Sequence, residues 1–477
     1  MPTLSKLVSA TQTHDARTRN GAITNSTSQS QLVDLFFIAW TLIGQDPQNY
    51  MQKWYWAYGE DKELAMRLLF WMRDVRWWAW VRDAFNYIYN GLSADEKKHF
   101  AHYIPEYGRW KDVFELAEQD FEPFKELIMF HLKQWPVQPD FWLFCKWFPR
   151  KGIVFNKVRK ELWVKPWKLR QIIVKGSDTV EQKMSAKEWD KILYEHVPSK
   201  AFAKYQKAFE RHDAERFSQF VDKTPEKIKS TTLFPADIYK EFDAWNHNDK
   251  VIEAQWKNLP NYIENGKTFL PVVDVSGSMS WGSGTRETGI TPIMNSISLG
   301  VYLAERNKSI FKDAFITFSE VPKMHYIKWD SVIPKFEYIK HDPDQWLNTD
   351  IQAVFDLVLN SAIDNNLTQE DLPDYIIILS DMEFDDPDIG GKYTNFEMIK
   401  RKFRTYSSIH QYEMPKLIFW NLNGRIGNVP VTINDDGVAL VSGYSPAIIK
   451  SVLSSKVVTP YDVMKETLDL PRYKCIV

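Results

Sequence analysis

Cysteine is almost absent from this sequence: Cys145 and Cys475 are the two copies, and they lie far apart. Two distant thiols cannot supply a disulfide framework or a zinc site with four cysteine ligands, so both are excluded and a reducing compartment is indicated. Long apolar runs are also absent, since none approaches the roughly 20 residues that a membrane-spanning helix needs. The first residues are polar and do not form a signal peptide. We therefore expect a soluble protein of the cytoplasm.

An excess of charge of either sign is missing as well. The 60 Lys and Arg residues nearly balance the 62 Asp and Glu residues, which leaves a net charge of −2. No global field then draws the protein to nucleic acid or to anionic lipid, and any basic surface must be local. What is present is the 44% hydrophobic and 26% charged content of a globular protein. The length of 477 residues exceeds what one hydrophobic core usually serves and predicts two or three domains.

The pattern along the chain divides into three parts. Residues 1–30 are rich in Ser, Thr, Asn and Gln, and we predict a flexible amino-terminal arm. Residues 31–265 show apolar positions at helical spacing, broken by Gly and Pro and without a strand signal or a clean repeat period, which predicts an array of short helices. In residues 266–477 short apolar runs alternate with helical patterns, which predicts a doubly wound, mostly parallel sheet.

The expected elements can be placed by residue number. In the helical part, helices are predicted at 61–75, 82–90, 95–102, 110–119, 121–134 and 141–148. In the sheet part, strands are predicted at 269–273, 313–318, 375–380, 416–420 and 438–441. Helices between and after these strands are predicted at 290–306, 349–364, 395–406 and 445–453.

One stretch organises the carboxyl-terminal part. Residues 269–279 read F-L-P-V-V-D-V-S-G-S-M, a short apolar run that ends in Asp274 and is followed by Ser276 and Ser278. Such a run predicts a strand buried on both faces, and open α/β sheets bind ligands beyond the carboxyl ends of their strands. One carboxylate and two hydroxyls can converge on a small divalent cation, because Mg²⁺ prefers oxygen ligands in octahedral geometry. An ordinary polar turn after a strand is the alternative interpretation.

Two later segments supply further oxygen donors. Thr349 begins a predicted helix, and Asp381 follows the apolar run of residues 375–380. Together with the earlier Asp, Ser and Ser they resemble the metal-ion-dependent adhesion site of von Willebrand factor type A domains. In that family D-x-S-x-S is followed by a distant Thr and then by an Asp after a hydrophobic strand. The resemblance implies one bound cation, Mg²⁺ or in its place Mn²⁺ or Ca²⁺, held by Asp274, Ser276, Ser278, Thr349 and Asp381.

The helical part carries a second resemblance. The segment G-R-W-K-D at residues 108–112 resembles part of the helical-repeat (TROVE) module of the Ro autoantigen, which precedes a type A domain in the same order. N-G-A at residues 20–22 and V-P-S-K at residues 197–200 are similar to hallmarks of the DUF2828 family, a Ro-like group. The resemblance implies a HEAT-like helical-repeat array over residues 31–265. It implies a Rossmann-like, von Willebrand type A domain over residues 266–477.

Tryptophan departs from this resemblance. The chain has 20 tryptophans, and several stand where glycine or another residue is expected. Glycine tolerates positive φ and close backbone approach, whereas tryptophan does neither, so these indoles would refill any tight turn that the glycines form. Natural divergence and engineering are both compatible with the sequence. The positions concerned are Trp40, Trp77, Trp78, Trp80, Trp163 and Trp346.

The Ro resemblance also implies an RNA ligand. Proteins with this architecture bind small structured RNAs and single-stranded RNA ends. Basic side chains for phosphates with aromatic side chains for bases suit single-stranded nucleic acid, although a solvated helix face over buried indoles produces the same pattern. The candidate RNA contacts are Arg73, Arg76, Arg109, Lys111, Arg150, Lys151, Arg159, Lys160, Lys168 and Arg170.

Three classes of function follow from these patterns. The first is a Ro-like, non-catalytic protein that holds a cation and binds RNA. The second is a cation-dependent protein-interaction or assembly module without RNA, in which the cation captures an acidic side chain of a partner or of a neighbouring subunit. A metal-assisted hydrolase is the third and has the least support, because no paired acids, Ser-His-Asp or Cys-His set has supporting context. We predict that the protein is not an enzyme; the sequence leaves its oligomeric state and its cognate ligand open.

Overall fold

The structure is a computed structural model that describes most of the chain. The described residues are 14–75, 81–133, 141–244, 248–263, 267–282, 285–318, 322–341, 349–386, 392–410, 412–454 and 459–477. The predictions for Arg76, Trp77, Trp78, Trp80 and Trp346 fall outside these ranges. Within them, no helix is both long and apolar enough to cross a bilayer.

The chain folds into two compact units. We call the first the α/β unit; it consists of Met1–Leu68, Leu233–Cys475 and Val477. The second, the helical unit, consists of Leu69–Thr232 and Ile476. This division differs from the one predicted at residue 265, because helices on both sides of the helical unit pack in the α/β unit. Helix α2 (Gln31–Ile38) packs on strand β8 (Val438–Ser442), and α16 (Pro235–Asp243) packs on α19 (Pro292–Arg306).

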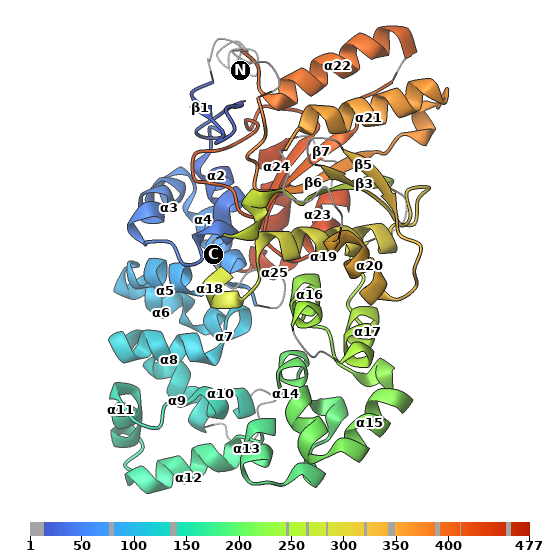
Figure 1. Ribbon diagram of the computed structural model, residues 1–477. Coiled ribbons are helices and arrows are strands. Elements are labelled where there is room, and N and C mark those ends of the chain that lie inside the picture. The colour runs from blue at the N-terminus through green and yellow to red at the C-terminus, as the bar shows by residue number, and fades with distance from the viewer. Residues whose placement is uncertain are drawn as a thin grey trace. The chain divides into compact units, whose positions relative to one another are not determined.

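A six-stranded, mostly parallel sheet forms the centre of the α/β unit (Figure 1). Its strand order is β5-β4-β3-β6-β7-β8, and β5 alone runs antiparallel. A helical amino-terminal part followed by this sheet is the predicted fold class, which is thereby confirmed. The strands are β3 (Phe269–Asp274), β4 (Ala314–Phe318), β5 (Lys323–Tyr326), β6 (Tyr375–Ser380), β7 (Lys416–Asn421) and β8.

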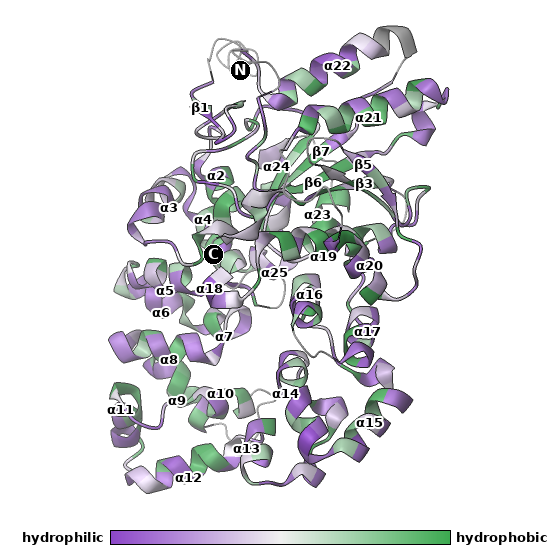
Figure 2. Cartoon of the chain, in the orientation of Figure 1, coloured by the Kyte–Doolittle hydropathy of each residue, from purple (hydrophilic) through white to green (hydrophobic). Residues whose placement is uncertain are grey.

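Strand β5 is the strand that the apolar pattern did not predict. Its sequence is K-M-H-Y, and of its four side chains only that of His325 is buried. The other five strands are buried along most of their length, and Figure 2 shows hydrophobic residues along the central ones. Most side chains of β5 face solvent, so its sequence lacks a continuous apolar run, whereas β8 at the other edge is covered by α2 and keeps one.

Helices cover the sheet. Helix α19 lies directly on β3, and Gly300 permits this close approach because a Cβ at this position would lie 2.3 Å from Cγ2 of Val273. Two further helices, α20 and α24, were not predicted. The helices that follow β5 are α20 (Val332–Lys340), α21 (Ile351–Asp364), α22 (Asn395–His410), α23 (Ile448–Ser454) and α24 (Pro460–Leu468).

The helical unit consists of short helices, as predicted. It is held by a largely aromatic core and by a buried ion pair between Arg73 and Asp112. Helix α4 (Lys62–Arg73) crosses the division between the units. The others include α5 (Arg82–Asn90), α6 (Ala94–Phe100), α7 (Ile104–Tyr107), α8 (Trp110–Gln119), α9 (Lys125–Lys133), α10 (Phe141–Trp147), α11 (Ile153–Glu161), α12 (Pro166–Gly176), α13 (Val180–Ser185), α14 (Ser199–His212) and α15 (Ala214–Lys223).

The segment of residues 14–30 differs from the predicted flexible arm. It contains a short antiparallel hairpin of β1 (Ala16–Arg17) and β2 (Ile23–Thr24). The backbone of Asn25 pairs with that of Val429, and the Thr18 hydroxyl donates to the carbonyl of Phe384. The polar composition suggested disorder because it offers little apolar surface; hydrogen bonds to distant loops hold the segment instead.

Two of the unexpected tryptophans can be located. Trp40 is buried, and its ring centroid lies 3.7 Å from that of Tyr444. Trp163 is 95% exposed and has a φ of +52°, in the left-handed region. It follows α11 in a Schellman motif, because its N–H donates to the carbonyl of Lys160 and the N–H of Val164 donates to that of Arg159. Glycine is the usual residue at this position of the motif, so Trp163 carries backbone strain.

We predict that Trp163→Gly stabilises the protein by about 0.5–1 kcal/mol. The left-handed backbone costs a non-glycine residue about 1–2 kcal/mol, and the greater freedom of glycine in the unfolded chain offsets about 0.5–1 kcal/mol of the gain. Urea denaturation measures the change. Trp163→Ala removes the same exposed indole without relieving φ and is the matched control. If Trp163→Ala proves as stable as Trp163→Gly, the backbone explanation is wrong.

Candidate metal centre

Strands β3 and β6 lie side by side at the centre of the sheet, where the strand order changes direction (Figure 1). The chain leaves β3 toward one sheet edge and returns through β6 to build the other half. Ligands of open α/β sheets bind at such a switch point, beyond the carboxyl ends of the strands. Val273 pairs with Leu379, so Asp274 and Ser380 end the two strands next to each other. Asp381 follows immediately.

Asp274 is completely buried, and its carboxylate is held from two directions. Its Oδ1 accepts a hydrogen bond from the N–H of Ser276 at 2.9 Å, and its Oδ2 accepts one from the hydroxyl of Ser380 at 2.6 Å. These bonds fix the direction in which the carboxylate points. Sequence analysis missed Ser380, although a hydroxyl at the end of an otherwise apolar strand was a visible signal.

Two serine hydroxyls and a second aspartate lie beside this carboxylate. The Oγ atoms of Ser276 and Ser278 are 3.1 Å apart, and the side chain of Ser278 hydrogen-bonds to Asp381. Oδ1 of Asp381 also accepts from the N–H of Glu383 at 3.1 Å. Asp381 is 2% exposed, so the centre contains two buried acids.

Thr349 joins the centre from the loop before α21. Its Oγ1 donates to the carbonyl of Glu383 at 3.0 Å and accepts from Nδ2 of Asn20 at 3.2 Å. A hydroxyl has one proton and two lone pairs, so one lone pair of Thr349 is left for a further partner. The structure links Asp274, Ser276, Ser278 and Asp381 by hydrogen bonds and connects Thr349 to them through Glu383, so the proposed residues come from three separate segments of the chain.

The electrostatics of the centre are dominated by burial. Burial raises the pKa of the Asp274 carboxyl, and the neighbouring charge of Asp381 raises it further. Burial also raises the pKa of Asp381, against the hydrogen bond from Ser278, which lowers it. Over the described ranges neither acid forms an ion pair with Lys, Arg or His. Two buried carboxylates without a basic partner need a proton or a cation between them.

The donor set fits a hard divalent cation. Two carboxylates and three hydroxyls are oxygen ligands of the kind that Mg²⁺ prefers, and none is a soft sulfur or imidazole ligand. A cluster of three or more His, Cys, Asp or Glu side chains is not found among the described residues. That finding does not bear on this centre, because its remaining ligands are hydroxyls. Asp274, Ser276, Ser278, Thr349 and Asp381 are thus the residues that would hold the cation.

A second layer of residues surrounds the centre, and the sequence analysis did not assign it. Glu383 is buried and receives Nε of Arg425 on Oε1 at 2.6 Å. Its Oε2 receives the backbone N–H of Arg19 at 2.6 Å. Asn20 donates from Nδ2 to the carbonyl of Glu383 at 2.8 Å. Glu383 thereby ties the loop after β6 to the amino-terminal hairpin and to the loop after β7.

The candidate RNA contacts divide into two groups in the helical unit. Three of them, Arg73, Arg109 and Lys111, lie at or near the start of α8, where Asp112 is buried. Arg73 is 2% exposed and pairs with Asp112, so it cannot contact RNA, and its prediction is corrected. Burial lowers the pKa of the half-buried Arg109 to about 10, and Lys111 lies 3.6 Å from Glu115. This group serves the packing of α8.

The second group lies at α11 and α12 and faces solvent. Arg159 is half-buried, whereas the other members are exposed: Arg150, Lys151, Lys160, Lys168 and Arg170. Trp163 is 95% exposed and Trp167 is 61% exposed in the same stretch. We call the exposed members and these two indoles the basic–aromatic surface.

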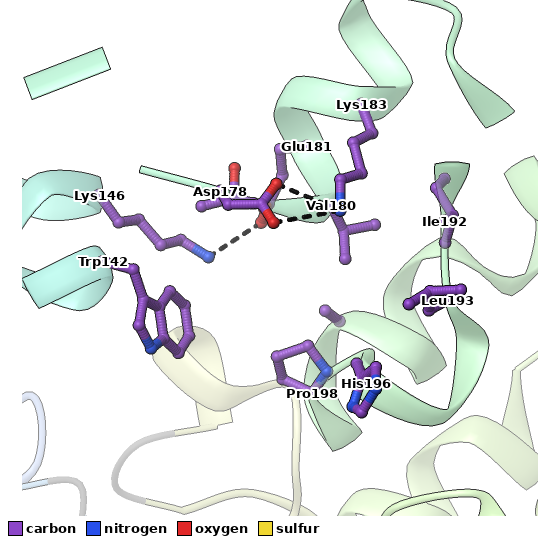
Figure 3. Close-up of a pocket in the computed structure, with 12 residues that line it drawn as sticks. Trp142, Lys146, Asp178, Val180, Glu181, Lys183, Ile192, Leu193, His196 and Pro198 are labelled. Carbon is purple, nitrogen blue, oxygen red and sulfur yellow. Dashed lines mark hydrogen bonds and ion pairs between the residues drawn. The ribbon is translucent and has the colours of Figure 1, made fainter. Parts of the chain in front are cut away.

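A separate cavity of about 380 Å³ opens in the helical unit (Figure 3). Trp142 and neighbouring apolar side chains line one side. Two ion pairs line the other, Lys146 with Glu181 at 3.1 Å and Lys183 with Asp178 at 3.1 Å. Each acid is paired with a lysine, so these pairs leave no charge unbalanced on that side. None of the predicted site residues lies here.

We predict that Mg²⁺ raises the melting temperature more at pH 8 than at pH 5.5. The folded-state pKa of both aspartates is raised, so the metal-free fold keeps protons that the unfolded chain loses above about pH 4. Its free energy of unfolding therefore falls as pH rises toward neutrality, and Mg²⁺ competes with those protons. At a hundredfold excess of Mg²⁺ over its dissociation constant the gain is about 2.7 kcal/mol.

Thermal denaturation with and without Mg²⁺ at the two pH values measures this difference. Asp274→Asn keeps an acceptor for the Ser276 N–H and removes the charge, so this variant should not respond to Mg²⁺ at either pH. An equal Mg²⁺ effect at pH 5.5 and pH 8 would contradict the assignment of the buried aspartates.

Two protein families and one viral protein are similar to this chain. Residues 269–469, from β3 onward, match the model of a domain of unknown function, DUF7788, and residues 153–268 match that of another, DUF2828. The chain is 25% identical over 520 aligned residues to "Uncharacterized protein L728" of Acanthamoeba polyphaga mimivirus, which covers 95% of this chain and 87% of the viral protein. The predicted DUF2828 resemblance is thus confirmed for residues 153–268, whereas the likeness to the Ro autoantigen and to type A domains stays a prediction.

Proposed function

We propose that this protein is a non-catalytic binding protein whose α/β unit holds a divalent cation. Mg²⁺ is the favoured ion, with Mn²⁺ or Ca²⁺ as substitutes. The observation that carries the proposal is the pair of buried carboxylates, Asp274 and Asp381, at the switch point of the sheet, which form no ion pair with a basic side chain among the described residues. Three hydroxyl oxygens, from Ser276, Ser278 and Thr349, complete the donor set.

Binding is favoured over catalysis because the proposed centre has no side chain available as a general base or nucleophile among the described residues. Both acids are occupied as cation ligands, so neither serves as a general base. Over the described ranges, no His or Cys side chain hydrogen-bonds to any of the five residues. Hydroxyl ligands and water complete an octahedral shell loosely, so an oxygen of an external ligand can replace water at the ion. A carboxylate of a protein partner is such an oxygen donor.

A second function, binding of single-stranded RNA, is supported by the basic–aromatic surface. Two exposed tryptophans, Trp163 and Trp167, lie here among exposed lysines and arginines. Nζ of Lys168 lies 5.9 Å from the ring of Trp167, and Arg170 lies over the ring of Phe155 at 5.2 Å. Aromatic faces for bases beside cations for phosphates are the elements of sequence-tolerant binding.

Mg²⁺ or Mn²⁺ titration calorimetry tests the cation site directly. We expect Asp274→Asn and Asp381→Asn each to weaken cation affinity more than about a hundredfold, because a side chain that contacts the ion is lost. We expect Ser380→Ala to weaken cation affinity about 10- to 100-fold, because the hydrogen bond that orients Asp274 is lost. Asp364→Asn, on an exposed aspartate at the end of α21, is the matched control. Unchanged affinity in Asp274→Asn would refute the site.

Fluorescence anisotropy with a labelled oligouridylate tests the RNA function. We expect Trp167→Ala to weaken binding about tenfold, because stacking of one base contributes about 1–3 kcal/mol, and we expect affinity to fall with rising salt. Trp56→Ala removes another half-exposed tryptophan, which lies on α3 (Gln48–Glu60) in the α/β unit, and should have no effect. Equal affinities for the two variants would contradict RNA binding at α11 and α12.

A further inference from the structure

A short hairpin near the amino terminus reaches the rim of the candidate metal centre. Strands β1 and β2 pair with Ala16 opposite Thr24, and the N–H of Gly21 donates to the carbonyl of Thr18 at 3.2 Å to close the turn. Gly21 has a φ of +94°, which a side chain would strain. Arg19 and Asn20 are therefore the central residues of the hairpin tip.

The tip is attached to the same residues that build the centre. Nδ2 of Asn20 donates to Oγ1 of the proposed ligand Thr349 at 3.2 Å and to the carbonyl of Glu383 at 2.8 Å. The backbone N–H of Arg19 donates to Oε2 of Glu383 at 2.6 Å. Glu383 lies two residues after Asp381 and donates its own N–H to that aspartate. The backbone of the hairpin tip is thus hydrogen-bonded to Glu383, which is itself bonded to the proposed ligands Asp381 and Thr349.

Three arginines lie at this rim, and the guanidinium of Arg19 differs from the other two in its ion pairing. Arg17 pairs with Asp386 at 3.6 Å, and Arg425 pairs with Glu383. Arg19 is exposed, and across the described part of the chain its guanidinium has no carboxylate partner. The backbone N–H of Arg19 is bonded to the carboxylate of Glu383, whose own N–H is bonded to Asp381, so the Arg19 side chain starts beside the centre.

Charge balance indicates what such a rim attracts. A divalent cation neutralises Asp274 and Asp381, Arg425 pairs with Glu383 and Arg17 pairs with Asp386, so the Arg19 guanidinium is available for an anion that approaches the ion. We propose that Arg19 is the outer anion contact of this centre. One oxygen of a partner protein's Asp or Glu carboxylate binds the cation, and the other receives the Arg19 guanidinium. This inference rests on the proposed cation site.

A carboxylate is favoured over a nucleic acid backbone by the surroundings. Asp350, Asp385 and Asp386 lie in the same loops as the proposed ligands, so this rim carries several acidic side chains. An isolated carboxylate can pair with the Arg19 guanidinium in a bidentate or bridging geometry. A chain of phosphates would bring further negative charges against these acids.

Titration of the full chain with a blocked peptide that contains one glutamate tests the inference. Mg²⁺ affinity is measured first by calorimetry, and peptide binding is then followed in saturating Mg²⁺ and in EDTA. We expect the peptide to bind only with Mg²⁺, its glutamine analogue not to bind, and Arg19→Ala to weaken the peptide about tenfold or more while Mg²⁺ affinity stays within about twofold. Arg17→Ala, on the same hairpin, should match the unaltered protein in both measurements.

The outcomes separate the two proposals. Loss of peptide binding in Arg19→Ala with intact Mg²⁺ affinity supports the role of Arg19. Equal peptide binding by Arg19→Ala and the unaltered protein overturns it and leaves the cation site standing. Arg19-dependent binding of an oligouridylate in Mg²⁺, without binding of the glutamate peptide, overturns the carboxylate assignment. Failure of the unaltered protein to bind Mg²⁺ overturns the proposed function and this inference with it.

Discussion

The arrangement of side chains at the carboxyl end of the parallel sheet depends on two carboxylates that are buried there close together. An unpaired buried charge costs several kcal/mol, and two like charges cost more. The residues at this edge supply hydroxyl and backbone donors to Asp274 and Asp381, and in the part of the chain that the structure describes no basic side chain pairs with either carboxylate. A divalent cation would bind tightly here, because it is attracted to both carboxylates and cancels the repulsion between them. The proposed function follows from that single imbalance.

Segments that lie far apart in the sequence are needed to close the centre. Glu383 is the point where they meet, since it receives the hairpin through Arg19 and the loop after β7 through Arg425. It also accepts the hydroxyl of Thr349 on its carbonyl. The amino-terminal segment is therefore a structural part of the α/β unit, although it precedes the helical unit in the chain. A rim built from such a segment can add chemistry that the sheet alone lacks.

The helical unit shows how basic residues serve different purposes. Arg73 pairs with the buried carboxylate of Asp112, which also receives the N–H of Arg109, and this cluster fixes the start of α8. At α11 and α12 the cations face solvent beside exposed indoles. Trp163 adds a conformational cost to its exposure, because its backbone adopts the left-handed geometry of a helix C-cap. Sequence spacing alone treats these arginines as equivalent, and burial distinguishes them.

The sequence by itself determined the inner strands, most of the helices and the five oxygen donors of the candidate centre. Apolar runs and the D-x-S-x-S turn are local features, whereas Thr349 and Asp381 were predicted from the resemblance to type A domains. Only the tertiary structure decided that Asn20 and Glu383 belong to the centre, that residues 14–30 are held in place, and that Arg73 is buried. Strand β5 was missed because its sequence has no apolar run. The places of Asn20 and Glu383 depend on hydrogen bonds between residues hundreds of positions apart, and the burial of Arg73 depends on an ion pair with Asp112 on another helix. Neither composition nor periodicity carries that information.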